Sequence, residues 1–292
     1  MPRIAYVNGS YVAHRHASVH IEDRGFQFAD GVYEVIALIN GEYADARGHL
    51  DRLERSLNEL SIVMPVPRQT LMMIIREVVR KNHSRNASIY IQISRGVAAR
   101  DFKFPTKSIR PSLIVTIRPF KFDGNQMVAK GGKAVTVPDI RWKRPDIKST
   151  SLLPQVLAKQ QAAAKGAYEA LMVDDEGFIT EGSSSNAWMV KGAKLITRKA
   201  DGHILRGVTR TALLALCDEY GITFEERSFT VEEAEQADEL FCTGAVALIV
   251  PLIELNGKPV GSGQVGPVAR KLYEAYRLYA HTEIKDQQPW SA

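Results

Sequence analysis

Hydrophobic and polar positions in the first 120 residues follow two periods, one typical of strands and one typical of helices. Two short apolar runs flank an Asn-Gly-Ser turn near the start of the chain, which is the pattern of a β-hairpin. Leu50, Leu53, Leu57 and Leu60 recur at the spacing of an amphipathic helix. The strands expected here are Ile4–Val7, Tyr11–Ala13, Gly31–Asn40, Ser88–Ser94 and Leu113–Arg118, and the helices are His49–Leu60 and Arg68–Asn82. We therefore expect residues 1–120 to form a small N-terminal α+β domain.

Apolar runs of strand length also alternate with helical patterns in the rest of the chain. Glycines among polar residues at 121–132 predict an interdomain linker, followed by a large domain over 133–281 and a flexible tail at 282–292. One helix is expected to end before Gly221, a residue type favoured just after a helix C-terminus. The strands expected here are Lys133–Val137, Glu169–Val173, Asn186–Val190, Leu195–Thr197 and Leu240–Leu252, and the helices are Leu153–Lys165, Thr209–Tyr220 and Gly266–Tyr279.

Composition narrows the class of protein. The chain has 292 residues, of which 45% are hydrophobic and 24% charged, the balance of a globular protein with two domains of ordinary size. The net charge is +5, but lysines and arginines are dispersed among acids instead of forming one basic stripe. This dispersal argues against nucleic acid as a partner, and a modest positive excess suits a phosphorylated cofactor and carboxylate substrates.

Cysteine usage and apolar run lengths indicate where the protein works. Cys217 and Cys242 lie in apolar surroundings without the spacing of metal ligands, which indicates reduced core thiols and no metal site. The first residues lack the apolar stretch of a signal peptide, and no run approaches the length that spans a membrane. We expect a cytoplasmic protein without a membrane partner.

Two segments about thirty residues apart carry the candidate chemistry. Lys148 lies in Asp-Ile-Lys-Ser-Thr, and Glu181 follows a strand pattern and precedes the hydroxyl-rich turn Gly-Ser-Ser-Ser-Asn. An amine that can form an imine, together with a carboxylate that can pair with a ring nitrogen, is the minimum apparatus for pyridoxal phosphate chemistry. The amine must be neutral to attack an aldehyde, and Arg141 and Arg144 are cations near enough in sequence to lower its pKa.

These segments resemble those of the fold-type-IV pyridoxal phosphate enzymes, and most closely the D-amino-acid aminotransferases. The matching segments are 22–35 (Glu-Asp-Arg-Gly-Phe-Gln-Phe-Ala-Asp-Gly-Val-Tyr-Glu-Val), 140–153 around the lysine, and 181–186 (Glu-Gly-Ser-Ser-Ser-Asn), within a resemblance that runs from about Tyr6 to Tyr279. The resemblance implies an α+β, two-domain architecture, with a small α/β domain and a larger β-barrel-like domain with flanking helices. It also implies pyridoxal 5′-phosphate as cofactor and Lys148 as the catalytic residue.

The resemblance assigns further residues to the cofactor. Arg206-Gly207-Val208-Thr209 has the form of a phosphate site, with small residues and a cation just before a helix. Leu205 is expected to pack against the cofactor ring. Relatives usually carry a hydroxyl residue at the position of Ala245, where only the backbone N–H can serve here. The cofactor contacts implied are Arg52, Lys148, Glu181, Leu205, Val208, Thr209, Gly244 and Ala245.

The substrate side departs from the family at one position. In D-amino-acid aminotransferases a tyrosine of the first motif joins an arginine and a histidine from the other subunit's loop to hold the α-carboxylate. Tyr33 and Arg100 match, but Phe102 stands at the histidine position. The resemblance therefore implies a homodimer with shared active sites, whose carboxylate trap has lost one hydrogen-bond donor.

Several functions share this apparatus. The leading hypothesis is transamination of a D-amino acid with a 2-oxo acid such as 2-oxoglutarate, with small-molecule amino and 2-oxo acids as partners. A branched-chain or (R)-amine transaminase is the alternative, and Phe102 keeps the amine as a possible substrate. A lyase of the aminodeoxychorismate type and a non-catalytic cofactor carrier are further classes. A half-reaction separates them, because a transferase leaves pyridoxamine phosphate and a lyase releases pyruvate without an amino acceptor.

Overall fold

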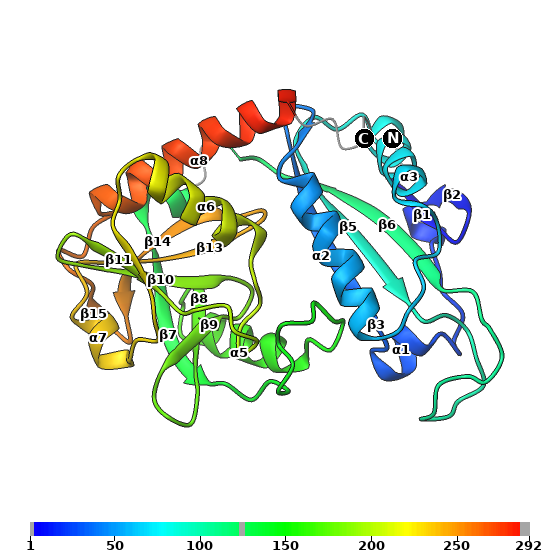
Figure 1. Cartoon of the computed structure of the whole chain (residues 1–292), viewed down its shortest axis with the longest axis horizontal. Coiled ribbons are helices and arrows are strands. Elements are labelled where there is room, and N and C mark those ends of the chain that lie inside the picture. Colours follow the sequence, from blue (N-terminus) through cyan, green and yellow to red (C-terminus); the bar gives the residue numbers. More distant parts are fainter. Residues whose placement is uncertain (1–2, 123–125, 287–292) are drawn as a thin grey trace. The chain divides into compact units, whose positions relative to one another are not determined.

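The computed structural model describes residues 3–122 and 126–286, which group into two compact units (Figure 1). The first unit holds 3–122, 147–151 and the helical residues from 281, and the second holds 126–146 and 152–280. The segment 147–151, which carries Lys148, thus groups with the N-terminal residues although it lies within the range expected for the large domain. The segment expected as a linker contains a short helix, α4 (Gln126–Lys130), and its residues 123–125 lie outside the described residues.

The first unit is one sheet covered on one face by two helices. The strand order is β2-β1-β6-β5-β3-β4, and each neighbouring pair is antiparallel. Its elements are β1 (Ile4–Val7), β2 (Ser10–Ala13), η1 (His14–His16), α1 (Arg24–Phe28), β3 (Gly31–Ile39), β4 (Glu42–Tyr43), α2 (Ala46–Glu59), α3 (Arg68–Lys81), β5 (Ala87–Ser94) and β6 (Ser112–Pro119). The expected hairpin, strands and helices of this part are confirmed to within three residues at each end.

Strand alternation gives this sheet two different faces. Ile89, Ile91 and Ile93 of β5 are fully buried and pack with Leu53 of α2 in one hydrophobic core. Residues between them on β5 point to the opposite face, where Tyr90 is only partly buried. One face therefore stabilises the unit, and the other is left to carry polar side chains.

The first sequence motif works as a buried anchor for this sheet. Asp23, 3% exposed, accepts hydrogen bonds from the Gly25 backbone at 2.8 Å, Ser94 Oγ at 2.7 Å and Ser112 Oγ at 2.6 Å. A Cβ at Gly31 would lie 2.8 Å from the Ile93 carbonyl oxygen, so only glycine allows β3 to approach β5 this closely. The motif thus fixes the start of β3, two residues before Tyr33.

The second unit is a curled sheet of mixed direction with helices around it. Its strands are ordered β12-β11-β10-β13-β14-β7-β8-β9, with β15 paired to β14. Its strands are β7 (Gly132–Pro138), β8 (Glu169–Val173), β9 (Ile179–Gly182), β10 (Asn186–Lys191), β11 (Lys194–Thr197), β12 (Phe224–Glu226), β13 (Glu239–Gly244), β14 (Leu248–Leu255) and β15 (Lys258–Pro259). Its helices are α4, α5 (Leu153–Ala164), α6 (Val208–Glu219), α7 (Val231–Glu235) and α8 (Pro267–Asp286), the last of which continues past residue 280.

The two faces of this sheet bury separate cores. Ala134 of β7 packs inward with Met189 and Val250, whereas its neighbour Val135 packs outward against Ala162 of α5. Parallel pairing of β7 with both β14 and β8 explains why this strand is apolar on both faces. The expected α+β class is confirmed.

One expected strand is wrong, and a helix occupies the start of the segment expected as a tail. The run Leu240–Leu252 forms two antiparallel strands, β13 and β14, in which Gly244 pairs with Leu248. The resemblance implies a turn at Thr243-Gly244-Ala245, but the apolar residues 245–248 include no Asn, Asp or Pro, so their hydrophobic pattern predicts one strand. Residues 282–286 continue α8, and 287–292 lie outside the described residues.

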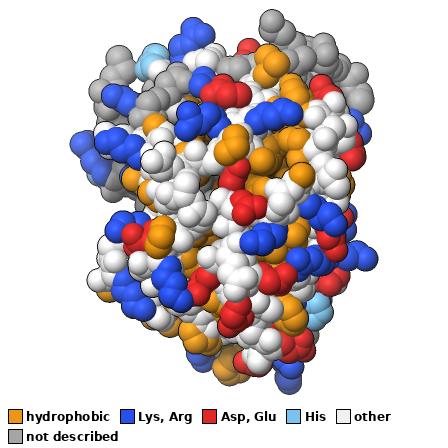
Figure 2. Space-filling view, turned by 90° about the vertical axis from the view of Figure 1, so that its left-hand side faces the viewer, with side chains coloured by type: hydrophobic (Ala, Val, Ile, Leu, Met, Phe, Trp, Pro, Cys, Tyr) orange, Lys and Arg blue, Asp and Glu red, His pale blue; other side chains and the backbone are white. Residues whose placement is uncertain are grey.

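Surface charge is mixed in sign. On the described part of the face drawn in Figure 2, lysine and arginine side chains are interspersed with aspartate and glutamate. Within residues 3–122 and 126–286, no helix has both the length and the apolar character needed to cross a membrane.

Candidate active site

Lys148 is held on the first unit by backbone hydrogen bonds. The Tyr33 N–H donates to the Lys148 carbonyl at 3.0 Å, and the Thr150 N–H donates to the Gly31 carbonyl at 3.0 Å. The Lys148 N–H reaches Ser56 Oγ on α2 at 3.3 Å. The segment therefore lies along the start of β3, and the position of the lysine does not depend on its own side chain.

The Lys148 amine lies beside a tyrosine pair. Its Nζ is 3.3 Å from Tyr33 Oη and 4.4 Å from the centre of the Tyr33 ring. Tyr33 stacks on Tyr90 with ring centres 5.6 Å apart, and Tyr90 Oη donates to Gln92 Oε1 at 2.7 Å. Burial, with Tyr33 nearby, raises the pKa of Tyr90 to about 12, so this hydroxyl stays protonated. The amine and the substrate-side tyrosine expected from the sequence are thus brought together.

Arg52 is fixed by a buried carboxylate. Its Nε donates to Glu34 Oε1 at 2.6 Å and its Nη2 to Glu34 Oε2 at 2.9 Å, and His49 Nδ1 lies 2.7 Å from the same Oε2. Although burial acts to raise it, Arg52 and His49 hold the pKa of Glu34 well below its usual range. On α2, Arg52 lies about one helical turn before Ser56, which contacts the Lys148 backbone, so Arg52 and the contact with Lys148 share one face of this helix.

This buried pair makes a stability prediction. Glu34→Gln leaves the Arg52 charge buried without its counter-ion, which we expect to cost roughly 3–5 kcal/mol of unfolding free energy. The folded-state pKa of Glu34 lies below the unfolded value of about 4.3. The difference in unfolding free energy between wild type and Glu34→Gln should therefore be complete above that pH and shrink as pH falls below it. Urea unfolding of both proteins at several pH values measures this.

The matched control is Glu77→Gln, which breaks an exposed ion pair with Arg80 on α3. Exposed pairs contribute little, so this variant should unfold like the wild type. Equal losses of unfolding free energy in Glu34→Gln and Glu77→Gln would show that the buried pair stabilises the fold no more than an exposed pair does.

Arg100 lies in the loop between β5 and β6 among aromatic rings. Its guanidinium is 5.2 Å from the ring centre of Phe28 and 5.7 Å from that of Phe102, and the two rings are 5.5 Å apart. Phe102 is 80% exposed. Among the described residues, the contacts of Arg100 are with these rings and do not include Tyr33 or Lys148.

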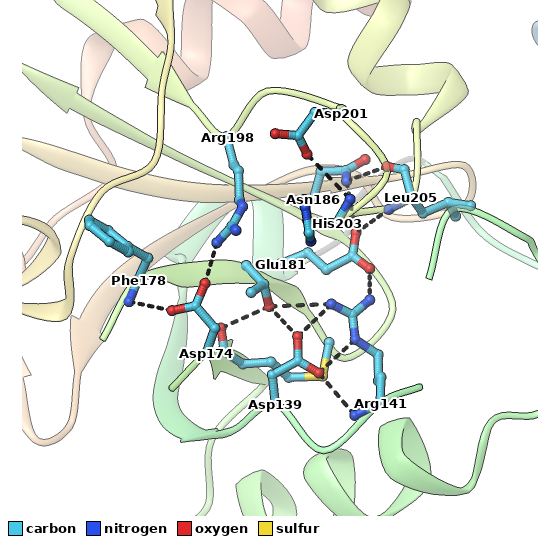
Figure 3. Close-up of polar contacts among 12 residues, drawn as sticks. Asp139, Arg141, Asp174, Phe178, Glu181, Asn186, Arg198, Asp201, His203 and Leu205 are labelled. Atoms are coloured by element: carbon cyan, nitrogen blue, oxygen red, sulfur yellow. Dashed lines mark hydrogen bonds and ion pairs between the residues drawn. The ribbon is translucent and has the colours of Figure 1, made fainter. Parts of the chain in front are cut away.

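Glu181 is at the end of β9 in the second unit and is surrounded by donors (Figure 3). Its Oε2 accepts from Asn186 Nδ2 at 3.1 Å and from the Leu205 N–H at 3.2 Å, and its Oε1 accepts from Arg141 Nη1. The residue is 6% exposed. A carboxylate held from three directions has one fixed orientation, as a partner for a ring nitrogen requires.

Asn186 connects the parts of this half of the site. Besides Glu181, its Nδ2 donates to the Leu205 carbonyl at 3.0 Å, and a Cβ at Gly207 would lie 2.0 Å from its Oδ1. Asn186 also pairs with Thr243 across β10 and β13, next to Gly244. The expected residues Glu181, Leu205 and Gly244 are therefore gathered around one amide. Asn186 is the last residue of the Glu-Gly-Ser-Ser-Ser-Asn motif, but this role was not predicted from the sequence.

The serines of the same motif have a structural role. Ser183 Oγ and Ser185 Oγ both donate to the buried carboxylate of Glu169, the latter at 2.8 Å. This fixes the turn that joins β9 to β10, and so the distance between Glu181 and Asn186.

The start of α6 has the features of an anion site. Gly207 is the N-cap and supplies no side-chain cap, so the first N–H groups of the helix are left for another acceptor. Thr209 is 3% exposed, and its Oγ1 is buried without a hydrogen-bond partner among the described residues. Both observations fit a phosphate at Val208 and Thr209. Gly244 is open as well, since a Cβ there would meet only the Ser184 carbonyl oxygen, at 3.5 Å.

The two arginines expected to lower the pKa of Lys148 have other partners in the second unit. Arg141 binds Asp139 through Nε at 2.9 Å and contacts Glu181, and Arg144 binds Asp146 at 2.9 Å. Sequence reasoning did not single out Asp139. The described residues contain no group of histidine, cysteine or acidic side chains able to hold a metal ion.

Comparison with known proteins identifies the family. Residues 31–255 match the model of the amino-transferase class IV family, and the chain belongs to that family. The D-alanine aminotransferase of Staphylococcus aureus (strain COL) is 38% identical over 274 residues, 94% of this chain and 96% of the relative. That of Bacillus licheniformis is 36% identical over 268 residues, 92% of this chain and 94% of the relative.

Solved structures confirm the expected two-domain architecture. The branched-chain amino acid aminotransferase of Escherichia coli superposes with a TM-score of 0.91 at 26% identity, covering 99% of this chain and 98% of that one. The branched-chain amino acid aminotransferase of Thermobaculum terrenum, in its PLP-form (holo-form), gives a TM-score of 0.83 at 25% identity, covering 99% of this chain and 97% of that one.

Both units present groups that fit the cofactor of this family. The second unit offers a fixed carboxylate at Glu181, an uncapped helix start and the orphaned hydroxyl of Thr209. The first offers the amine of Lys148 and the fixed cation of Arg52. These are the acid, anion site and amine that pyridoxal 5′-phosphate needs.

Proposed function

We propose that this protein transfers the amino group of a D-amino acid to a 2-oxo acid such as 2-oxoglutarate, with pyridoxal 5′-phosphate as cofactor. The observation that carries the proposal is the Lys148 amine beside the Tyr33 hydroxyl on one unit, with the Glu181 carboxylate held by three donors on the other. The chain aligns over 94% of its length with a D-alanine aminotransferase that is 38% identical, and this similarity supports a D-amino acid as the donor.

The cofactor supplies an electron sink for the pair left when a substrate Cα–H bond breaks. Lys148 is the residue that takes the proton from Cα of the amino donor and, in the second half-reaction, gives a proton to the corresponding carbon of the 2-oxo acid, because its amine is anchored by backbone contacts and oriented by Tyr33 Oη. Glu181 keeps the ring nitrogen protonated. Thr209 and the α6 N-terminus bind the phosphate, and Arg52 adds a positive charge.

Tyr33 and Arg100 are proposed to hold the substrate carboxylate, with Arg100 acting in the neighbouring subunit's site. Arg100→Ala should then raise KM for D-alanine by roughly tenfold or more, since a hydrogen bond to a charged group contributes about 1.5–3 kcal/mol. An (R)-arylamine without a carboxylate should be affected little. Steady-state kinetics with 2-oxoglutarate as acceptor measures both.

The control for this loop is Lys103→Ala, which removes an exposed cation three residues away. Equal, small losses for D-alanine and the arylamine in Arg100→Ala would place the carboxylate elsewhere. Strong native use of the arylamine that survives the substitution would favour the (R)-amine transaminase, the function that Phe102 keeps open.

A branched-chain transaminase is the second candidate, because the solved structures reported above are branched-chain enzymes. D-alanine and L-leucine compared as donors in one half-reaction distinguish it. Pyridoxamine phosphate left on the enzyme identifies the donor that is used. Because D-alanine gives pyruvate in a transaminase half-reaction as well, a lyase would be identified by repeated release of pyruvate with no acceptor and no conversion of the cofactor to pyridoxamine phosphate.

We also propose a homodimer in the cytoplasm. Leu153, Val156 and Leu157 form an exposed apolar stripe on α5, at 68%, 58% and 46% exposure, and Phe104 in the Arg100 loop is 58% exposed. Apolar surface of this kind is typical of an interface. Both cysteines are free, buried thiols, as suits a reducing compartment.

Sedimentation tests the homodimer at micromolar concentration, where the wild type should run as a dimer. Leu157→Glu should shift it toward monomer and lower activity in parallel, whereas Lys165→Glu, just beyond the end of the same helix, should not. A fully active monomer would contradict the shared active site.

A further inference from the structure

An ion-paired chain of alternating charge ends at Glu181 (Figure 3). Arg141 donates to Glu181 through Nη1 and to Asp139 through Nε at 2.9 Å and Nη2 at 2.6 Å. Asp139 also accepts the Arg141 backbone N–H at 3.1 Å. The guanidinium therefore lies between two carboxylates, with the aspartate on the side away from Glu181.

This chain is buried and fixed. The side chains of Asp139, Arg141 and Glu181 are 11%, 3% and 8% exposed. The Thr180 hydroxyl lies 2.7 Å from Asp139 Oδ2, and the Asp139 N–H donates to the Val173 carbonyl at 2.7 Å, which ties Asp139 to the end of β8. Although burial opposes it, Arg141 lowers the pKa of Asp139, so this carboxylate is charged.

The signs of these charges matter for a cationic partner of Glu181. With Arg141 alone, the carboxylate and guanidinium would form a neutral pair, which attracts a second cation only weakly. Asp139 changes this, because two carboxylates against one guanidinium leave one net negative charge. A nearby negative charge favours the protonated form of a base, and screening by water is weak in a buried site.

We propose that Asp139 is a positioning residue which, by neutralising Arg141, leaves Glu181 able to hold a pyridine nitrogen in its protonated form. The inference rests on the proposed function, in which Glu181 is the partner of that nitrogen. It assigns to Asp139 and Arg141 a role in setting the charge of the cofactor ring without touching it.

The proposal predicts opposite results for two neighbouring substitutions. Asp139→Asn leaves a neutral Arg141–Glu181 pair, so the protonated fraction of the ring nitrogen should fall and kcat should drop roughly tenfold, as for one pKa unit. KM should change little. Arg141→Gln leaves two carboxylates, so the nitrogen should stay protonated. The double variant removes one charge of each sign and should restore protonation relative to Asp139→Asn.

A matched control lies in the same unit. Asp174 accepts from Arg198 Nη1 at 2.7 Å and from the Phe178 N–H at 2.9 Å, and its partners do not include Arg141 or Glu181 among the described contacts (Figure 3). Asp174→Asn removes the same charge from a comparable ion pair and should leave the ring nitrogen unchanged.

The test is ¹⁵N NMR of holoenzymes reconstituted with pyridoxal phosphate labelled at the ring nitrogen, at neutral pH. Wild type, Arg141→Gln, the double variant and Asp174→Asn should give the protonated shift, and Asp139→Asn should move toward the neutral shift. A protonated nitrogen in Asp139→Asn, or a neutral one in Arg141→Gln, overturns the inference. If Asp139→Asn does not fold, a neutral nitrogen in Arg141→Gln still overturns the inference.

Glu181→Gln separates this inference from the proposed function. A shift toward neutral in Glu181→Gln with none in Asp139→Asn removes the role of Asp139 and keeps that of Glu181. An unchanged shift in Glu181→Gln shows that Glu181 is not the partner of the nitrogen, and then the assignment of the site itself fails.

Discussion

Replacing Lys148 with alanine is expected to lower the transamination rate by at least about 10²–10⁴-fold, the contribution of a positioned general acid–base group. The loss should be in kcat, because this amine moves the proton at the substrate Cα. Folding should be little affected, since backbone groups of Tyr33, Lys148 and Thr150 hold the segment in place. Stopped-flow measurement of the half-reaction with D-alanine gives the rate directly.

Lys143→Ala is the control, because it removes an exposed lysine from the same stretch of chain. It should keep wild-type rates. A Lys148→Ala enzyme that transaminates within tenfold of wild type would show that another base moves the proton.

Glu181→Gln should keep the cofactor and reduce kcat by roughly 10²–10³-fold, the usual cost of losing one electrostatic partner at a reacting centre. The amide keeps the size of the side chain, and its oxygen can still accept from Asn186 and Leu205, although its NH2 group cannot accept from Arg141. It cannot hold the ring nitrogen protonated. Cofactor content by absorbance and kcat by coupled assay separate loss of binding from loss of rate.

Asn186→Ala helps to interpret this result. It removes a hydrogen bond to Glu181 but leaves the carboxylate charged, so its effect should be smaller than that of Glu181→Gln. Near wild-type turnover in Glu181→Gln would make Glu181 a structural residue at the end of β9.

Local sequence signals predicted most of the fold because they match the forces that form each element. The leucines from Leu50 to Leu57 define the buried face of α2, and the Asn-Gly turn defines the first hairpin. The boundary between β13 and β14 was missed because Gly244–Leu248 is an apolar turn. Leu248 has a left-handed backbone there, at φ 58°, and leucine is not a residue type that signals such a conformation.

The site was predictable where one residue carries the chemistry and not where contacts between distant residues do. Lys148 and Glu181 stand out in their motifs. Glu34 acts through Arg52, and the role proposed for Asp139 depends on the contact of its neighbour Arg141 with Glu181; no local pattern reveals such long-range contacts. Likewise the sequence offers Arg141 as a neighbour of Lys148, whereas its charge is engaged by Asp139 and Glu181.

The most direct test of the central claim is to reduce the holoenzyme with borohydride and map the labelled peptide by mass spectrometry. The purified protein should be yellow, and reduction should fix one phosphopyridoxyl group on Lys148. A label on another lysine, or no label on a protein that binds the cofactor, would contradict the assignment of Lys148 and the mechanism built on it.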